Sequence, residues 1–207
     1  MVERITVAAL VQAGFEAVEE HGLSGLTMRD VAQRLGVKAP AIYWHLKSRR
    51  DLVDEMATEM WRRIDAEVAP ISAGLSAEEA LVGFAREVRR QALARRDGAR
   101  LLAGTYLTDD TLLRDQQARL DAVGSPDERR QMLTAFTLVY SFVIGYVIEE
   151  QARLAAPELY DPAVRAARVG DADPALSAVA LATGDQRFEQ LLGMIITTVR
   201  REVLPEP

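Results

Sequence analysis

Aromatic and basic side chains crowd one short segment of the chain, from Leu26 to Leu52, which reads LTMRDVAQRLGVKAPAIYWHLKSRRDL. Three consecutive rings and four cations stand out within it: Tyr43, Trp44, His45, Lys38, Lys47, Arg49 and Arg50. Cations attract phosphate groups, and a phenol can donate a hydrogen bond to a phosphate while its ring lies along the backbone. The combination indicates contact with a nucleic acid.

Two short helices are expected to position these side chains. Met28–Leu35 forms the first, and Gly36 follows, where a left-handed turn costs little. The second runs from Ala39 to about Leu46, with Pro40 in its first turn, where a missing N–H is harmless. Apolar residues of both helices are spaced to pack against a preceding helix; they are Val31, Leu35, Val37 and Ile42. The pattern predicts a helix-turn-helix whose second helix enters the DNA major groove.

The motif offers two kinds of DNA contact. Tyr43, Lys47 and Arg49 are expected at phosphates, because the last two lie where the next helix begins. The free N–H groups of that helix start also suit an anion. Base contacts must come from residues that face the groove, which we predict to be Arg29, Lys38, Ala39, Ala41 and Tyr43. Arginine and lysine bond guanine edges, whereas alanine offers only methyl contact to thymine.

A second interpretation of the same residues is purely structural. Tyr43 and Trp44 would then be core side chains, and the cations would form a solvated face. For Tyr43, Lys47 and Arg49 we favour DNA contact, while for Trp44 both interpretations stay open. His45 is interpreted as a cap or packing residue.

Composition limits the classes of protein to which the chain can belong. It has 207 residues, 49% of them apolar, and no cysteine, which excludes disulfides and thiolate catalysis. No apolar run reaches about 18 residues and no signal peptide begins the chain, so we expect a cytoplasmic protein without a membrane segment. Residues 1–50 hold 7 Lys+Arg and 5 Asp+Glu, whereas the remainder hold 18 and 26. Only the first part is therefore expected to meet an anionic partner.

Helical signals dominate throughout, so the predicted fold is all-α. Capping boxes of the form Ser/Thr-x-x-Asp/Glu are expected to begin helices at Thr27, Ser48, Ser76 and Ser125. Outside the motif, helices are predicted over about 3–21, 49–68, 109–123, 126–155 and 185–203, with two more flanking the turn at 95–98. The 126–155 helix is apolar all round and is expected to be buried on all sides. The region 157–184 is expected to be loose, with one or two short helices.

The stretch from Leu26 to Ala57 resembles the DNA-binding head of TetR-type transcriptional repressors. It carries L-T-x-R-x-x-A-x-x-L-G-V, then Y-W-H, then K-x-[KR]-x-x-L. RRDGARLLAGT at 95–105 and GYVIEEQ at 145–151 resemble ligand-domain segments of that family. The resemblance implies an all-helical homodimer that binds a palindromic operator and releases it when a small molecule binds. By position, it implies DNA contacts at Thr27, Arg29, Ala39, Pro40, Ala41, Tyr43, Trp44, Lys47 and Arg49.

The predicted organisation is a three-helix head and a helical-bundle body. Residues 1–48 form the helix-turn-helix DNA-binding domain, and residues 49–207 the ligand-binding and dimerisation domain, with helix 49–68 connecting them. The 126–155 and last helices are expected to pair with their copies, where Gly145 and Gly193 permit close approach. Burial within one subunit is the alternative for part of each face. Because no flexible linker separates head and body, ligand binding near Asp65 is expected to swing the head.

A ligand pocket is expected among the helices of the body. The resemblance and the mixed polarity of these helices point to Asp65, Phe84, Val88, Leu102, Thr105, Tyr106, Tyr140, Tyr146 and Glu149. Phe84, Val88 and Leu102 would alternatively be plain core, and Glu149 a surface residue or an arginine partner. The three tyrosines are better candidates, because a buried phenol needs a hydrogen-bond partner.

The expected effector is a hydrophobic or aromatic small molecule. Tetracycline-binding members of the family hold their drug as a magnesium chelate with a histidine, and Leu102 occupies that position here. Of the corresponding residues, Thr105 and Glu149 are kept. Both histidines of the chain, His21 and His45, lie in the head. We therefore expect no metal and no cofactor.

Two other classes of function compete with this one. A helical-bundle carboxylate enzyme requires Glu-x-x-His pairs, which the sequence lacks, so no enzyme is expected. A dimeric DNA-binding regulator without a small-molecule inducer, acting as an orphan regulator or an activator, is the alternative function.

Overall fold

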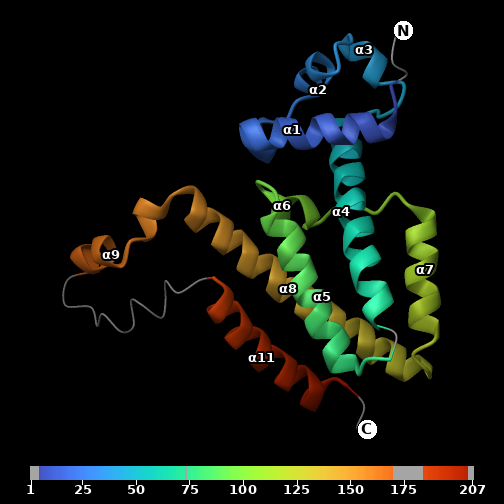
Figure 1. Cartoon of the computed structure of the whole chain (residues 1–207), viewed down its shortest axis with the longest axis vertical. Helices are drawn as coiled ribbons and strands as arrows, with labels where there is room; N and C mark the ends of the chain where they lie inside the picture. The colour runs from blue at the N-terminus through green and yellow to red at the C-terminus, as the bar shows by residue number, and fades with distance from the viewer. Residues whose placement is uncertain (1–4, 73, 170–183, 205–207) are drawn as a thin grey trace.

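The computed structural model describes residues 5–72, 74–169 and 184–204, and all regular structure within them is helical. The head contains α1, α2 and α3, and α4 leads from it into the body (Figure 1). The helices are α1 (Val7–Gly25), α2 (Met28–Arg34), α3 (Ala39–Ile42), α4 (Arg49–Ser72), α5 (Ala77–Leu93), α6 (Gly98–Leu102), α7 (Asp110–Asp121), α8 (Pro126–Ala155), the 3₁₀ helix η1 (Pro157–Tyr160), α9 (Pro162–Val169) and α11 (Asp185–Glu202). The predicted all-α class is confirmed, and α4 begins at the predicted junction of head and body.

Local chemistry accounts for the helix starts. Ser76 and Ser125 form complete capping boxes, each with a glutamate three residues later that reaches back to the serine N–H. The box at Thr27 is only half formed, because Asp30 accepts a bond from the Thr27 hydroxyl at 2.7 Å and not from the Thr27 N–H. At Ser48, Asp51 accepts from the Ser48 hydroxyl and also from the backbone N–H of Lys47.

Two helix lengths differ from the prediction. Helix α3 ends at Ile42 rather than near Leu46, because the Ile42 carbonyl accepts from both His45 N (2.9 Å) and Leu46 N (3.0 Å). This shared carbonyl tightens the chain into a turn that carries the aromatic residues. Helix α4 continues through Pro70 to Ser72, two residues past the proline at which it was expected to stop.

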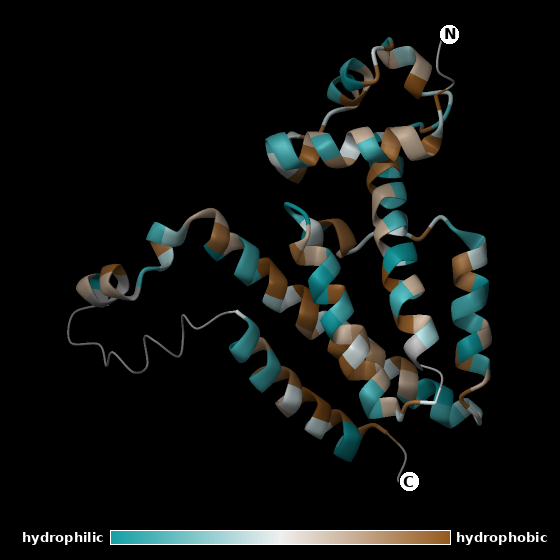
Figure 2. Cartoon of the chain, in the orientation of Figure 1, coloured by the Kyte–Doolittle hydropathy of each residue, from teal (hydrophilic) through white to brown (hydrophobic). Residues whose placement is uncertain are grey.

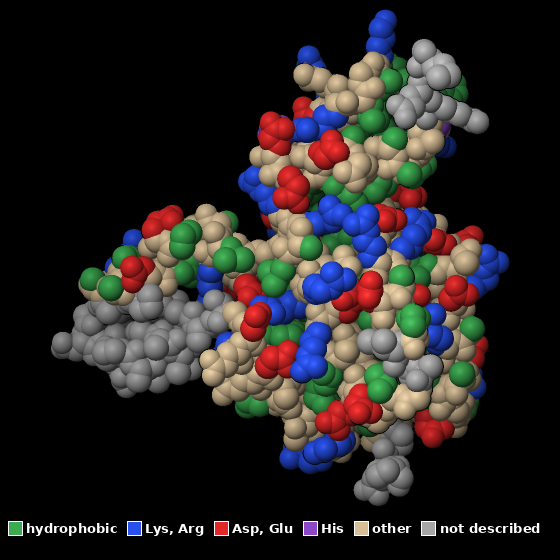
Figure 3. Space-filling view, in the orientation of Figure 1, with side chains coloured by type: hydrophobic (Ala, Val, Ile, Leu, Met, Phe, Trp, Pro, Cys, Tyr) green, Lys and Arg blue, Asp and Glu red, His purple; other side chains and the backbone are tan. Residues whose placement is uncertain are grey.

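The turn between α5 and α6 binds the head to the body. Asp97 adopts a left-handed conformation with φ of 55°, and its Oδ2 accepts the Leu23 N–H of α1 at 2.7 Å. Arg96 donates to two carbonyls of α1, and the Arg95 guanidinium lies 3.8 Å from the centre of the Phe15 ring. Figure 3 shows basic side chains gathered where the head meets the body. The head is therefore attached at two places, through α4 and through this turn.

The core runs without interruption from the head into the body. Helix α5 packs against both α4 and α8, so it forms the centre of the body. Leu10 and Ile42 in the head, Met60 in α4 and Val88 in α5 are fully buried members of one apolar cluster. The head and the body therefore share one apolar core.

The prediction that α8 is buried on all sides is wrong. One of its faces is exposed, and it includes Leu133, Leu138 and Ile148. By length and composition α8 could cross a membrane, yet only 28% of its most apolar stretch is buried in the chain. The long core helix of a soluble protein can have the same length and composition. Figure 2 shows hydrophobic residues along α8 and α11.

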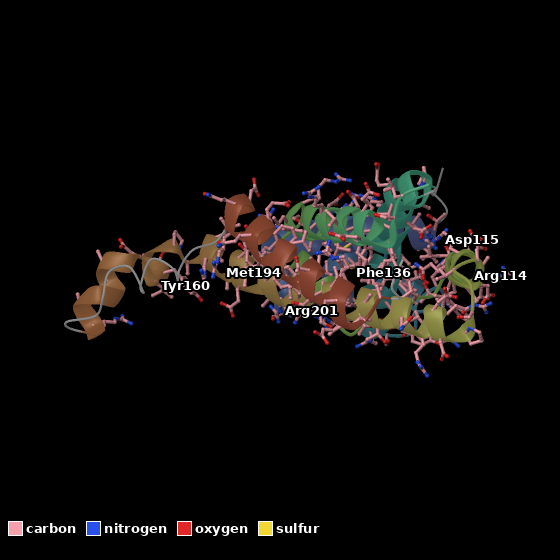
Figure 4. The ribbon with its side chains drawn as sticks, turned by 90° about the horizontal axis from the view of Figure 1, so that it is seen from below. Arg114, Asp115, Phe136, Tyr160, Met194 and Arg201 are labelled. Atoms are coloured by element: carbon pink, nitrogen blue, oxygen red, sulfur yellow. The ribbon has the colours of Figure 1, made fainter. Side chains whose placement is uncertain are left out.

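Beyond α8, the chain forms an arm that extends from the body. It comprises η1 and α9, and Figure 4 shows Tyr160 well away from the rest of the molecule. The Arg153 guanidinium lies 5.4 Å from the Tyr160 ring centre, which ties η1 to the end of α8. The predicted short helices within 157–184 exist up to Val169, and residues 170–183 lie outside the described residues.

Candidate DNA-binding and ligand-binding sites

An exposed aromatic surface lies at the outer end of the head. Trp44 is 88% exposed and Tyr43 is 47% exposed, so the core interpretation of these two rings is wrong. Together with Pro40 they line a shallow hollow on the surface of the head. Large apolar groups in water are unfavourable, and such a cluster marks an interaction site.

The four cations nearest the aromatic residues divide into two pairs. Arg49 and Arg50 are exposed but are bonded within the chain: Arg49 Nε donates to the Leu26 carbonyl at 2.9 Å, and Arg50 Nε donates to both carboxylate oxygens of Asp54 at 3.0 Å. Lys38 and Lys47 are exposed, and no side-chain partner is described for either. The lysines are thus the cations for which no bond within the described chain competes with a phosphate, whereas Arg49 also fastens α4 to the loop before α2.

The start of α4 is already occupied by a carboxylate. Asp51 accepts from the Ser48 hydroxyl at 2.7 Å and from the Lys47 N–H at 2.9 Å. These bonds lower the pKa of Asp51 below its usual range. A phosphate at this helix start would have to compete with a carboxylate that is ionised at neutral pH.

The remaining predicted DNA contacts lie at the start of α2 and in α3. Arg29 and the Thr27 side chain are exposed at the start of α2, although the Thr27 hydroxyl is already bonded to Asp30. Ala39 and Ala41 are half-buried in α3, so each offers little more than a methyl group. A surface of lysine, tyrosine and alanine methyl groups would form few direct hydrogen bonds with the edges of DNA bases.

An aromatic cluster in the body is the centre of the candidate ligand site. Tyr140 lies 5.5 Å from Trp61 and 6.5 Å from Phe84, measured between ring centres, and Phe84 lies 5.0 Å from Phe136. The Tyr140 hydroxyl donates to the Leu102 carbonyl at 2.9 Å. Burial raises the pKa of Tyr140 to about 12, so the phenol stays protonated and remains a donor.

The structure brings together only some of the predicted ligand residues. Phe84, Leu102, Thr105 and Tyr140 form one group, in which Thr105 also donates to the Leu102 carbonyl, at 3.0 Å. Val88 is fully buried in the core, which supports its alternative interpretation.

Four predicted ligand residues lie apart from this group. The expectation that Tyr106 is a buried phenol is wrong, because the residue is 74% exposed. Asp65 forms an ion pair with Arg119, and Glu149 is exposed with Arg153 at 3.9 Å, as its alternative interpretation expected. Tyr146 belongs to a second aromatic cluster, with Phe142 and Phe188, and donates to the Gly184 carbonyl at 3.0 Å.

Two members of the aromatic cluster were not predicted from the sequence. Trp61 lies beside Met60 on α4, and Phe136 lies one turn before Tyr140 on α8. The four-residue spacing of Phe136 and Tyr140 places both rings on one helix face and could have identified Phe136. Trp61 carried no comparable signal, because it has no aromatic neighbour in the sequence.

Metal-binding groups are scarce around this cluster. Among the described residues, no group of three or more His, Cys, Asp or Glu side chains could hold a metal ion. Residues 49–207 contain no histidine at all.

Comparison with known proteins identifies the family. Residues 10–56 match the family described as "Bacterial regulatory proteins, tetR family", and residues 74–202 match the "Tetracyclin repressor-like, C-terminal domain". The chain belongs to the TetR family. It is therefore a DNA-binding transcriptional regulator and not an enzyme.

Individual TetR-family proteins resemble the chain over most of its length. Tetracycline repressor protein class D of Escherichia coli is 35% identical over 159 residues, covering 74% of this chain and 70% of the relative. A possible TetR family regulator from Streptomyces coelicolor A3(2) superimposes with a TM-score of 0.75 at 30% identity, covering 95% and 99% of the two chains. TetR (class A) in complex with 5a,6-anhydrotetracycline and magnesium gives a TM-score of 0.63 at 28% identity, covering 93% and 96%.

Proposed function

We propose that this TetR-family regulator is a cytoplasmic repressor that binds a palindromic operator as a homodimer and releases it when a hydrophobic or aromatic small molecule binds. The observation that carries the proposal is the exposed surface of Tyr43 and Trp44 beside Lys38 and Lys47. Its rings and cations suit the sugar-phosphate backbone, and the motif beneath suits the major groove.

The exposed face of α8 supports the homodimer. Thr134, Leu138, Ser141, Gly145 and Ile148 recur at three- and four-residue steps and form a stripe along α8. On α11, the exposed residues Gly193 and Met194 lie on a corresponding face. A methyl group added to Gly145 or Gly193 would meet no described atom within 4 Å outside its chain neighbours and its own helix backbone, which leaves room for a partner helix.

A dimer of this kind satisfies the geometry of operator recognition. Two-fold symmetry applies the same patch of each subunit to the other, so four helices, two α8 and two α11, would form the interface. The two recognition helices must then lie about 34–36 Å apart to read half-sites one DNA turn apart.

The aromatic cluster around Tyr140 supports an aromatic or hydrophobic effector. Trp61, Phe84, Phe136 and Tyr140 present ring faces and edges on which a flat molecule could stack. The Tyr140 hydroxyl donates to the Leu102 carbonyl, and its oxygen could accept a hydrogen bond from a polar group of such a molecule.

A tetracycline–magnesium chelate is the second candidate effector, because a relative was solved with 5a,6-anhydrotetracycline and magnesium. The absence of histidine from residues 49–207 argues against it, since imidazole is the common nitrogen ligand for a bound metal. Titration with 5a,6-anhydrotetracycline, with and without magnesium, decides between the two. Tight magnesium-dependent binding would overturn our proposal of a metal-free effector.

The experiment that tests the DNA-binding proposal is selection from random duplexes at two salt concentrations. We expect a palindromic site whose affinity falls steeply with salt, as phosphate contacts require. The selected duplex then allows small molecules to be screened for release. Weak binding without sequence preference would contradict an operator-binding role.

The alternative of an orphan regulator or an activator concerns the same DNA-binding surface. A selected operator whose complex resists a broad screen of aromatic compounds would favour it over a ligand-released repressor.

A further inference from the structure

The segment that joins α6 to α7, residues 104–109, lies along α4 and is held there by polar bonds. Four side chains of α4, each one turn from the next, bond this segment in order: Arg50 donates to Gly104 O (2.7 Å), Asp54 Oδ1 accepts from Tyr106 N (3.0 Å), Thr58 Oγ1 accepts from Thr108 N (3.0 Å), and Arg62 Nε donates to Asp109 Oδ2 (2.6 Å). We call this row of bonds the polar seam.

The spacing of the seam follows from backbone geometry. Four residues of an α-helix rise about 6 Å, because each residue rises about 1.5 Å. Two residues of an extended chain advance about 6.6 Å. Each step of four residues along α4 therefore matches a step of two residues along the segment, from Gly104 to Tyr106 to Thr108. The helix and the segment stay in register.

The centre of the seam is buried and its hydrogen-bonding groups are committed. Thr58 is fully buried, and its hydroxyl donates to the Asp54 carbonyl at 2.8 Å, so its lone pairs are left to accept from Thr108. Asp54 is 8% exposed and is neutralised by Arg50. If α4 moved partway along the segment, these buried acceptors would lose their donors, which disfavours intermediate positions.

The seam also meets the candidate ligand site. Thr105 lies inside the segment and shares the Leu102 carbonyl with Tyr140. Arg50, at this same end of the seam, is in the first turn of α4, directly below the head. The end of the seam nearest the head therefore lies beside the candidate ligand site.

We propose that the polar seam fixes α4, and with it the head, in one discrete position relative to the body, and that losing the seam frees the head to pivot. The turn at Asp97 holds α1 at a separate point, so the head stays attached and pivots about that turn. The functional use of this pivot in DNA release rests on the proposed function, whereas the mechanical claim does not.

The test measures the distance between head and body directly. Because the chain has no cysteine, the substitutions Gln33→Cys on α2 and Arg130→Cys on α8 place spin labels only at these exposed sites. Labelled chain is diluted with unlabelled chain, so that pulsed electron resonance reports the distance within one chain. The measurement uses the full chain without DNA or effector.

Thr58→Val keeps the side-chain shape and removes the acceptor for Thr108. We expect a single narrow distance in the labelled parent, and a broadened or second distance in the Thr58→Val variant. Hydrogen exchange should become about tenfold faster at the Tyr106 and Thr108 amides as the segment opens locally. Arg62→Gln should likewise broaden the distance. Because Arg62 is at the surface, this variant tests the proposal even if the Thr58→Val variant does not fold.

Arg63→Gln is the matched control. Arg62 and Arg63 are neighbours on α4 and both pair with Glu59, but only Arg62 reaches Asp109. The distance in the Arg63→Gln variant should equal that of the parent. Faster exchange at Thr108 with an unchanged distance in the Thr58→Val and Arg62→Gln variants would overturn the proposal. Failure of operator binding would leave this result untouched and would instead count against the proposed function.

Discussion

Single side chains decide what the head can bind. Lys47 and Arg49 are two positions apart in the sequence and both are exposed, yet only Arg49 is described with a side-chain bond, to the backbone of the loop before α2. Residue type and spacing predicted that both would contact phosphate. They could not show which cation folds back, because that depends on where the carbonyls of Leu23 and Leu26 come to lie.

The first prediction follows from this difference. Lys47→Ala should weaken operator binding and lower the salt dependence, by a slope of about 1 for each lysine–phosphate pair that the substitution removes. Arg49→Ala should instead lower the melting temperature, because the carbonyls of Leu23 and Leu26 lose a charged donor. Binding at several salt concentrations and thermal melting check the pair. A changed salt slope with an unchanged melting temperature in Arg49→Ala would contradict the assignment.

The second prediction concerns Tyr140. Its pKa is raised by burial to about 12, above the ordinary value of 10.0. The folded state thus favours the neutral phenol, and this contribution to stability is complete below about pH 10 and is lost as the pH rises towards about 12. Subtracting the alkaline absorbance titration of Tyr140→Phe from that of the parent should reveal one late-ionising phenol. Ionisation of this phenol near pH 10 in the folded protein would contradict a buried position.

At the scale of elements, the sequence predicted most helices and their order. Capping boxes with glutamate were correct at Ser76 and Ser125, whereas the box with aspartate at Thr27 was half formed. The recognition helix α3 is shorter than its apolar pattern indicated, because the pattern does not report the shared Ile42 carbonyl. Hydropathy also gave no sign of the polar seam, whose partners are about 50 residues apart in the chain.

The third prediction tests the turn between α5 and α6. A methyl group on Gly98 would lie 2.1 Å from the Ala92 carbonyl oxygen, so Gly98→Ala must displace the turn. We expect a loss of about 1–3 kcal/mol in the free energy of unfolding, as for other overpacked sites. Urea unfolding measures it. Stability equal to that of the parent would show that the turn moves freely.

At the scale of the whole molecule, family and fold were predicted correctly, whereas the predicted burial of α8 on all sides is not met within the single chain. Hydropathy indicates that a helix needs apolar surroundings and does not say whether its own chain or a second copy provides them. In a single chain, the stripe with Leu138 and Gly145 faces solvent. The aromatic cluster around Tyr140 was predicted only in part, because Trp61 and Tyr140 meet through tertiary packing.

The fourth prediction addresses this stripe. Leu138→Arg should dissociate the proposed homodimer, because a charge would be buried at the interface without a partner. Leu113→Arg on α7 is the matched control: Leu113 is 40% exposed and Leu138 is 47% exposed, but only Leu138 lies on the stripe. Sedimentation velocity distinguishes monomer from dimer, and circular dichroism confirms retained helices. Dimers in both variants would place the interface elsewhere.

The double attachment of the head bears on how such regulators can be recombined. A hybrid made by joining a foreign head to this body at residue 48 would keep α4 but would place new residues opposite Asp97 and Arg96. Leu23 follows a glycine with φ of 72°, and a larger residue at Gly22 would crowd the Asp97 carboxylate. Heads that have glycine at this position are compatible donors, and others need the 95–98 turn transplanted with them. The exchangeable unit is therefore the head together with a four-residue piece of the body.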